Sequence, residues 1–216
     1  ELAPYMEISA LRENNGWLYA AAKSGKNGCL LRMQPDGTGR TEVLTTAGEI
    51  TDFAFAPDGT IWMTTLESEG GRLYRGNSDQ WGVTVELTVS QIDGRALSCP
   101  TAVAAASDGT VYFTDLAAAR ARHGVESALR TELTAHTGTG SVYVYDPAAR
   151  TVETVLTGIA GASGLALDEA AETLYVSDLG SRCVWAVDTA ARDLTAGGKG
   201  CSTHLYGLPG YPGALS

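Results

Sequence analysis

The sequence lacks long hydrophobic runs and any excess of basic residues. No stretch approaches the roughly 20 apolar residues that a membrane-spanning helix needs, so no membrane span is expected. Lys and Arg number 15 against 25 Asp and Glu, which makes the net charge −10. Because nucleic-acid binding starts from a basic surface, we expect no nucleic-acid partner.

The N-terminal segment ELAPYMEIS lacks the basic and then apolar pattern of a signal peptide. Three alternatives remain open: a cytosolic chain, a processed chain, or a piece of a longer one.

Cysteine is scarce, and its spacing excludes the common metal-binding patterns. The four cysteines, Cys29, Cys99, Cys183 and Cys201, form no CxxC or Cys/His ligand pattern, so a structural zinc site is not expected. Cys183 and Cys201 flank a hairpin-sized segment, which leaves two readings open: a disulfide, if their strands are neighbours, or two buried thiols. A disulfide would imply an oxidising compartment. A secretory or extracellular location is the expectation.

Four segments of the chain repeat one unit, which consists of a turn, a strand with an aromatic residue near its start, and a second β-rich segment. The turns and first strands read ENNGWLYAA, APDGTIWMTT, SDGTVYFTD and DEAAETLYVSD. The aligned aromatic residues lie 43, 50 and 63 residues apart and are Tyr19, Trp62, Tyr112 and Tyr175. Four-stranded propeller blades need about 40–50 residues each, so the spacing predicts a β-propeller.

Composition agrees with this fold class. The chain has 26 glycines in 216 residues, which suits many short strands joined by tight turns. In the second segments, small residues alternate with bulky ones, as in SVYVYD and CVWAVD, a period of two that is typical of strands covered on both faces. We therefore predict one all-β propeller domain over residues 1–216, with four blades and the start of a fifth.

From Gly94 onward, the order of motifs resembles a known family. The segments are GRALSCPTAVAAASDGTVYFTD, a helical insertion, GTGSVYVYDPAAR, GASGLALDEAAETLYVSDLGSRCVWAV and LYGLPGYPGALS. This order is similar to that of strictosidine synthase-like proteins, relatives of the SMP-30, gluconolactonase and paraoxonase propellers, over about residues 50–216. The last blade resembles NHL-type repeats equally well, but the insertion from Leu116 to Gly140 favours the first family. The resemblance implies six blades, so the chain is expected to be incomplete at its C-terminus.

The insertion is the one place with helical periodicity, because Val125, Leu129 and Leu133 recur every four residues. It lies between the strands of the third visible blade and is expected to cross one end of the propeller. The resemblance implies that it roofs a small-molecule pocket at the mouth of the central channel. His123, near its start, titrates near neutrality and is a candidate ligand contact, although a solvated surface histidine is the default interpretation.

The metal-dependent lactonases of this superfamily place Glu, Asn and Asp around the channel axis, and the matching turns of this chain differ. They offer Thr101 and Ala102 in CPTAV, Ser163 in GASGLAL and Gly213 in GYPGAL, while only Glu7 falls where a first acidic ligand is expected. Hydroxyl, methyl and hydrogen do not replace charged oxygen ligands. We therefore expect no cofactor, and calcium is disfavoured.

No catalytic residue is assigned. Strictosidine synthases use a glutamate of the sixth blade, and the resemblance reaches only the opening turn of blade five. Asp115 and Asp178, which end their strands, are expected to accept backbone amides. Thr101, Ser163, Tyr211 and His123 are the candidate ligand-binding residues, for a small organic molecule or a protein partner.

Two functions remain. The first is a noncatalytic or degenerate binding propeller. The alternative is a small-molecule enzyme of the strictosidine synthase-like or lactonase/arylesterase type with a pocket at the channel, and the fold alone does not separate them.

Overall fold

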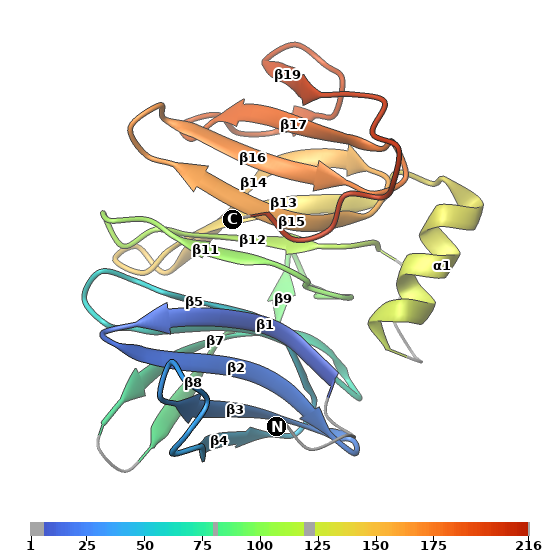
Figure 1. Cartoon of the computed structure of the whole chain (residues 1–216). Coiled ribbons are helices and arrows are strands. Elements are labelled where there is room, and N and C mark those ends of the chain that lie inside the picture. Colours follow the sequence, from blue (N-terminus) through green and yellow to red (C-terminus); the bar gives the residue numbers. More distant parts are fainter. Residues whose placement is uncertain (1–6, 80–81, 119–123, 216) are drawn as a thin grey trace.

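The computed structural model describes residues 7–79, 82–118 and 124–215, and it shows four antiparallel sheets stacked as blades (Figure 1). Blade 1 contains β1 (Glu7–Asn14), β2 (Trp17–Ser24), β3 (Asn27–Met33) and β4 (Thr41–Thr46). Blade 2 contains β5 (Glu49–Phe55), β6 (Ile61–Glu67), β7 (Gly70–Ser78) and β8 (Val83–Val89). A hairpin, β9 (Gln91–Ile92) and β10 (Arg95–Ala96), connects blade 2 to blade 3.

Blade 3 contains β11 (Val103–Ala105), β12 (Val111–Asp115), β13 (Gly140–Asp146), β14 (Thr151–Ile159) and the added β18 (Leu194–Thr195). Blade 4 contains β15 (Ala162–Asp168), β16 (Thr173–Asp178), β17 (Cys183–Asp188) and β19 (Cys201–Leu205). Within each blade, consecutive strands pair antiparallel, and β18 alone pairs in parallel, onto β14. The predicted all-β propeller with four visible blades is confirmed.

Each blade begins one strand earlier than the repeat read from the sequence. The aromatic residue of the repeat lies on the second strand of its blade, while β1, β5, β11 and β15 precede it. These four first strands pack side by side in chain order. They are the inner strands; Glu7 begins β1, Ser163 lies on β15, and Thr101 lies just before β11.

Three apolar layers of the core lie between neighbouring blades, and two further clusters lie under α1 and on β2 and β3 of blade 1. On β13 the predicted period of two holds, because Val142 and Val144 pack toward blade 4, while Tyr143 and Tyr145 pack toward blade 2. The Tyr145 ring meets that of Trp62 edge to face, with centroids 5.7 Å apart. Both faces of a central blade are thus covered, as the sequence pattern indicates.

Asp-Gly turns close the hairpins between inner and second strands. In blade 2, Asp58 Oδ1 accepts the Thr60 amide at 2.9 Å, and Gly59 has φ of 85°. In blade 3, Asp108 Oδ1 accepts the Thr110 amide at 2.8 Å. The side-chain bond and the positive φ are the reasons that Asp and Gly suit these turns.

The helix α1 (Val125–Ala135) lies between β12 and β13 and covers one end of the propeller, at the right of Figure 1. Its apolar side, formed by Val125, Leu129 and Leu133, packs on a cluster that includes Leu66 of blade 2 and Leu179 of blade 4. The predicted helical insertion across one end is confirmed.

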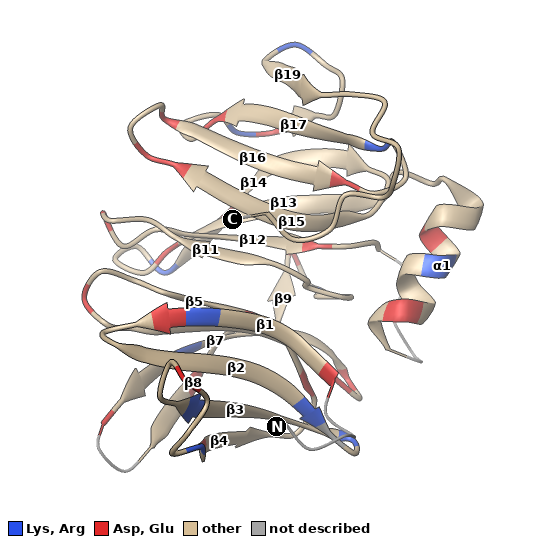
Figure 2. Cartoon of the chain, viewed as in Figure 1, with Lys and Arg blue, Asp and Glu red and all other residues tan. Residues whose placement is uncertain are grey.

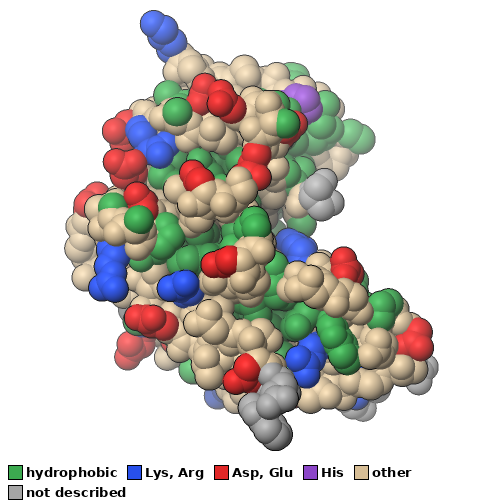
Figure 3. All heavy atoms as spheres, turned by 90° about the vertical axis from the view of Figure 1, so that its left-hand side faces the viewer, with side chains coloured by type: hydrophobic (Ala, Val, Ile, Leu, Met, Phe, Trp, Pro, Cys, Tyr) green, Lys and Arg blue, Asp and Glu red, His purple; other side chains and the backbone are tan. Residues whose placement is uncertain are grey.

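The four blades form an arc with two free faces. Seen from the end opposite α1, hydrophobic side chains gather between the blades, and a notch opens on the right of the view (Figure 3). On blade 1, Ile8 and Leu11 are 44% and 50% exposed. The six blades implied by the resemblance stay a prediction.

The surface is acidic without one dominant patch. Asp and Glu are scattered over all four blades and α1 (Figure 2). Within the described residues, no helix is long and apolar enough to cross a membrane.

All four cysteines are free. Although β17 and β19 are neighbours, the register places Cys201 opposite Val187, four residues along the strand from Cys183. The structure therefore favours the reading of free thiols, and the secretory or extracellular location stays a prediction without a disulfide to support it.

Candidate functional site

The candidate site is the end of the propeller axis next to α1, where the inner strands begin. Three of these strands have a break in their pairing register at or beside a hydroxyl residue: Ser9 in β1, Thr51 in β5 and Ser163 in β15. Thr101 holds the corresponding place just before β11. The sequence prediction selected two of these four positions, Thr101 and Ser163.

Three of the four hydroxyls bind the backbone of the next unit. Ser9 Oγ donates to the Ile50 carbonyl at 2.5 Å, Thr101 Oγ1 to the Ala162 carbonyl at 2.7 Å, and Ser163 Oγ to the Pro212 carbonyl at 3.0 Å. Each acceptor lies immediately before the corresponding residue of the following unit. These hydroxyls therefore connect successive units around the axis.

A second row of hydroxyls, on the second strands, supports the first. Thr51 Oγ1 bonds to Thr64 Oγ1 at 2.9 Å, Thr101 Oγ1 lies 2.9 Å from Thr114 Oγ1, and Ser163 Oγ lies 2.8 Å from Ser177 Oγ. In addition, Ser177 Oγ donates to the Gly213 carbonyl at 2.7 Å. The hydroxyl network is internally bonded, and it holds residues 212–213 alongside β15.

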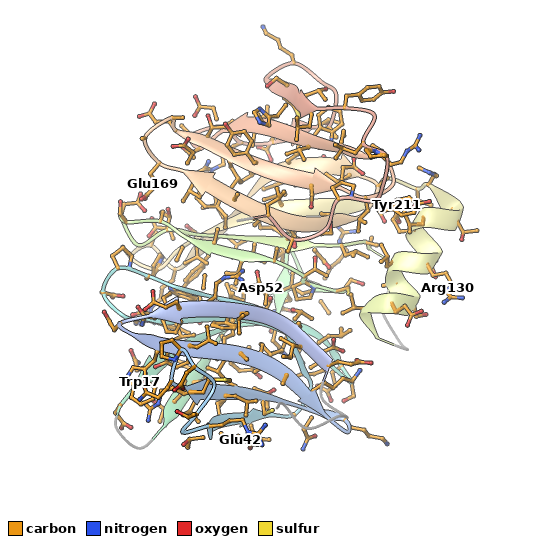
Figure 4. The ribbon with its side chains drawn as sticks, viewed as in Figure 1. Trp17, Glu42, Asp52, Arg130, Glu169 and Tyr211 are labelled. Atoms are coloured by element: carbon orange, nitrogen blue, oxygen red, sulfur yellow. The ribbon has the colours of Figure 1, made fainter. Side chains whose placement is uncertain are left out.

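The structure brings together three of the predicted ligand residues. They are Thr101, Ser163 and Tyr211. The Thr101 hydroxyl bonds to the carbonyl next to Ser163, the Ser163 hydroxyl bonds to the Pro212 carbonyl, and Tyr211 precedes Pro212. Tyr211 is 64% exposed and lies at the α1 end (Figure 4). His123 lies outside the described residues.

The residues at this end do not match the needs of a divalent cation. Glu7 begins β1, with an exposed side chain whose carboxylate is 3.9 Å from Lys23 Nζ. Within residues 7–79, 82–118 and 124–215, no three His, Cys, Asp or Glu side chains gather in a ligand-like group. The hydroxyls of Thr101 and Ser163 carry no charge and are bonded to carbonyls, whereas calcium takes six to eight oxygen ligands.

Asp115 and Asp178 accept hydrogen bonds in the blades, as predicted. Asp115 accepts the backbone amides of Ser98 and Cys99 at 2.9 and 2.6 Å. Asp178 accepts the Ser181 amide at 3.1 Å and Trp185 Nε1 at 3.0 Å. Burial raises the pKa of Asp115 to about 6, against the lowering effect of the two amides.

Sequence reasoning missed one buried carboxylate close to the axis. Asp52 Oδ1 pairs with Arg12 Nη2 at 2.9 Å, and Asp52 Oδ2 accepts the Val103 amide at 3.0 Å. Burial raises the pKa of Asp52, and the Arg12 guanidinium opposes that rise. Through these two bonds, the Asp52 carboxylate connects β1, β5 and β11. Its partners lie 40 and 51 residues away, so no local pattern in the sequence indicates it.

The bonds from the hydroxyls of Ser9, Thr101 and Ser163 to the next unit, which we call the hydroxyl chain, give a first test. Replacing Thr101 by valine keeps the side chain's shape but leaves the Ala162 carbonyl without its donor. We expect the free energy of unfolding in urea to fall by about 1–2 kcal/mol. Thr88→Val on exposed β8, where the hydroxyl makes only a 3.4 Å contact, is the control and should be near neutral. Equal effects of the two substitutions would contradict a connecting role for Thr101.

The pKa of Asp115 gives a second test. Because its pKa is raised in the folded state, its contribution to stability is largest in acid and is lost as pH rises through about 6. Between pH 7 and pH 5 we expect wild-type protein to gain roughly 1 kcal/mol of unfolding free energy relative to Asp115→Asn. Chemical unfolding of both proteins at the two pH values measures this difference. A loss on acidification would show that the carboxylate is stabilised as an anion.

The fold is shared with solved propeller structures of low sequence identity. A chain of a nidogen/laminin complex superposes with a TM-score of 0.71 at 16% identity, covering 98% of this chain and 68% of that one. A gluconolactonase from Xanthomonas campestris gives 0.63 at 21%, covering 91% and 61%. A luciferin-regenerating enzyme gives 0.61 at 14%, covering 96% and 64%. The chain thus spans about two thirds of the length of these proteins.

No curated protein sequence matches the chain. The narrower likeness to strictosidine synthases stays a prediction. The sequence model of the family described as SMP-30/Gluconolactonase/LRE-like region, in contrast, matches residues 69–212. This range is more than half of the sequence and covers most of blades 2 to 4 taken together. The chain therefore belongs to the SMP-30/gluconolactonase/LRE-like family of β-propellers.

Proposed function

We propose that this chain is a noncatalytic binding propeller, which uses the α1 end of its axis to hold a small organic molecule or a protein. The observation that carries this proposal is the hydroxyl chain. Thr101 and Ser163 stand where the resemblance places metal ligands in lactonases, and both donate their hydroxyl hydrogens to backbone carbonyls. Such groups support a binding surface better than an activated metal or nucleophile.

Tyr211 is the residue best placed to contact a partner at this end. Its side chain is 64% exposed, and the Ser163 bond to the neighbouring Pro212 carbonyl fixes its backbone. An exposed tyrosine offers a large contact area with little loss of conformational entropy on binding. The nidogen/laminin structure supports a protein partner, because its similar chain belongs to a complex between proteins.

The enzyme alternative draws support from α1. The helix covers the mouth of the axis, and an enclosed reaction needs such a cover. Under this alternative the chemistry is that of a lactonase, an arylesterase or a strictosidine synthase-like condensation of amine and aldehyde.

A turnover assay separates the two functions. The protein at its native length is offered lactones, aryl esters, and amine plus aldehyde pairs, with and without added calcium. We expect rates equal to those of buffer alone. Turnover that falls when Thr101 is replaced by valine would overturn the noncatalytic function.

Calorimetry with calcium tests the ligand set directly. We expect no binding tighter than millimolar, because the side chains at the axis end supply too few charged oxygens. Micromolar affinity would contradict our interpretation of these positions, whatever the turnover assay shows.

A further inference from the structure

A second polar site lies away from the axis, beneath the hairpin β9–β10. The hairpin turns at Asp93 and Gly94, with φ of 49° and 76°. Positive φ at both central residues is the type I′ geometry that Asp-Gly adopts in two-residue hairpins. Arg95 pairs with Ile92 across this turn, so a short, well-defined hairpin holds its backbone.

The hairpin is anchored to blade 2 at its base. The Leu97 amide donates to the Ser90 carbonyl at 3.0 Å, and the Leu97 carbonyl accepts the Gly71 amide at 2.8 Å. Leu97 itself is 2% exposed. These contacts fix the hairpin relative to blade 2.

Between the hairpin, β13, β14, Ala118 and the residues Gly138 and Thr139 after α1 lies a crevice of about 480 Å³. This volume is in the range of small-molecule sites. Five hydroxyl side chains line the crevice: Ser98, Thr139, Ser141, Tyr143 and Thr157. Ile92 contributes apolar surface, and the buried Leu97 lies in the crevice wall.

Among residues 7–79, 82–118 and 124–215, Arg95 is the one charged residue that lines the crevice. Its exposed guanidinium makes no ion pair with a described residue. The nearby carboxylate of Asp115 does not line the crevice and accepts the amides of Ser98 and Cys99. The carboxylates of Asp115 and Asp93 act on Tyr143 from outside the crevice, while the charge on the described crevice wall itself is the positive charge of Arg95, which suits a carboxylate.

Ser98 supplies an independent indication of a ligand. It is 5% exposed, and among the described residues its Oγ is the one buried side-chain polar atom without a hydrogen-bond partner. A buried hydroxyl left unbonded costs free energy, so such an atom in a native protein calls for a partner. A ligand oxygen in the crevice would supply it after a rotation of the side chain.

We propose that this crevice binds a small hydroxylated carboxylate. Arg95 pairs with the carboxylate, and the hydroxyls of Ser98, Ser141 and Tyr143 bond to the hydroxyls of the ligand. Ile92 contacts its carbon skeleton. This site is distinct from the axis end, and the proposal does not depend on whether the axis end is catalytic.

The test is calorimetry on the full chain with three probes: quinate, which has a carboxylate and several hydroxyls, its uncharged methyl ester, and benzoate, which lacks hydroxyls. We expect saturable binding of quinate, and binding of the other two that is weaker by about tenfold or more. Absence of saturable quinate binding would overturn the proposal.

Variants locate the site. Arg95→Gln should weaken quinate binding by about tenfold or more, whereas Arg75→Gln should leave it unchanged, because Arg75 is exposed on β7 outside the crevice. Ser98→Ala removes an unpartnered hydroxyl, so it should weaken binding while the protein stays folded. Quinate binding that falls with Thr101→Val but not with Arg95→Gln would place the ligand at the axis end, and so would overturn this site while leaving the proposed function intact.

Discussion

Replacing Asp52 by alanine should lower the free energy of unfolding by about 3–5 kcal/mol. The carboxylate is 8% exposed, lies between the inner strands of blades 1, 2 and 3, and bonds to Arg12 and the Val103 amide (Figure 4). Alanine leaves the guanidinium and the amide without their acceptor in a partly dry environment. Removing one partner of a buried pair costs far more than the pair contributes on balance. Urea unfolding measures the loss.

An exposed ion pair of the same kind is the control. Glu126 and Arg130 pair at 2.8 Å on α1, with side chains that are 83% and 78% exposed. Glu126→Ala should cost only about 0.3–0.5 kcal/mol, because solvent screens this pair. Should Asp52→Ala prove as mild as Glu126→Ala, the carboxylate would have no role in joining the three blades.

The double-mutant cycle with Arg12 identifies the origin of the loss. If the unpaired guanidinium accounts for most of it, Arg12→Leu in the Asp52→Ala background should recover part of the stability. The Val103 amide stays without an acceptor in either background, so full recovery is not expected. Additive effects of the two substitutions would contradict a direct coupling between the two side chains.

The second strands of the blades could be predicted because their signals are local. In each repeat, a turn with Asp, Asn or Gly lies within a few residues of an aromatic residue such as Trp62 or Tyr112. The inner strands carry small residues, as in Val103–Ala105, and their pairing becomes evident only when the blades are assembled. The two-residue strand β18 depends entirely on its contact with β14, through bonds such as that from the Ala196 amide to the Thr157 carbonyl.

The candidate site was predictable in position but not in chemistry. The resemblance indicated Thr101 and Ser163 as neighbours around the axis, and the structure places them so. Their carbonyl partners are 61 and 49 residues away in sequence, so the connecting role of the hydroxyls could not be read from it. The hairpin at Asp93 and Gly94 is different, because Asp-Gly is a strong turn signal that is local in the sequence.

Replacing Gly71 by alanine should cost about 3 kcal/mol, at the upper end of the usual range for overpacking. A Cβ at this position would overlap the ring of Pro100, which leads into blade 3, and would come within 3.2 Å of Leu97 Cβ. A proline ring on a fixed backbone moves little, so the blades themselves must separate. Chemical unfolding measures the loss, with Gly210→Ala as the control, because a Cβ there meets nothing within 4 Å.

The same close approach recurs at the other blade junctions. A Cβ at Gly28 would overlap the Gly48 carbonyl at the entry to blade 2, and one at Gly140 would overlap the carbonyls of Leu116 and Ile159 at the entry to blade 4. In blade 4 the aligned residue is Arg182, which is exposed. Glycine is thus present in three blades where the segment that leads into the next blade packs closely. A Gly71→Ala protein as stable as Gly210→Ala would show that the blades can shift apart at little cost, and would remove this explanation for the three glycines.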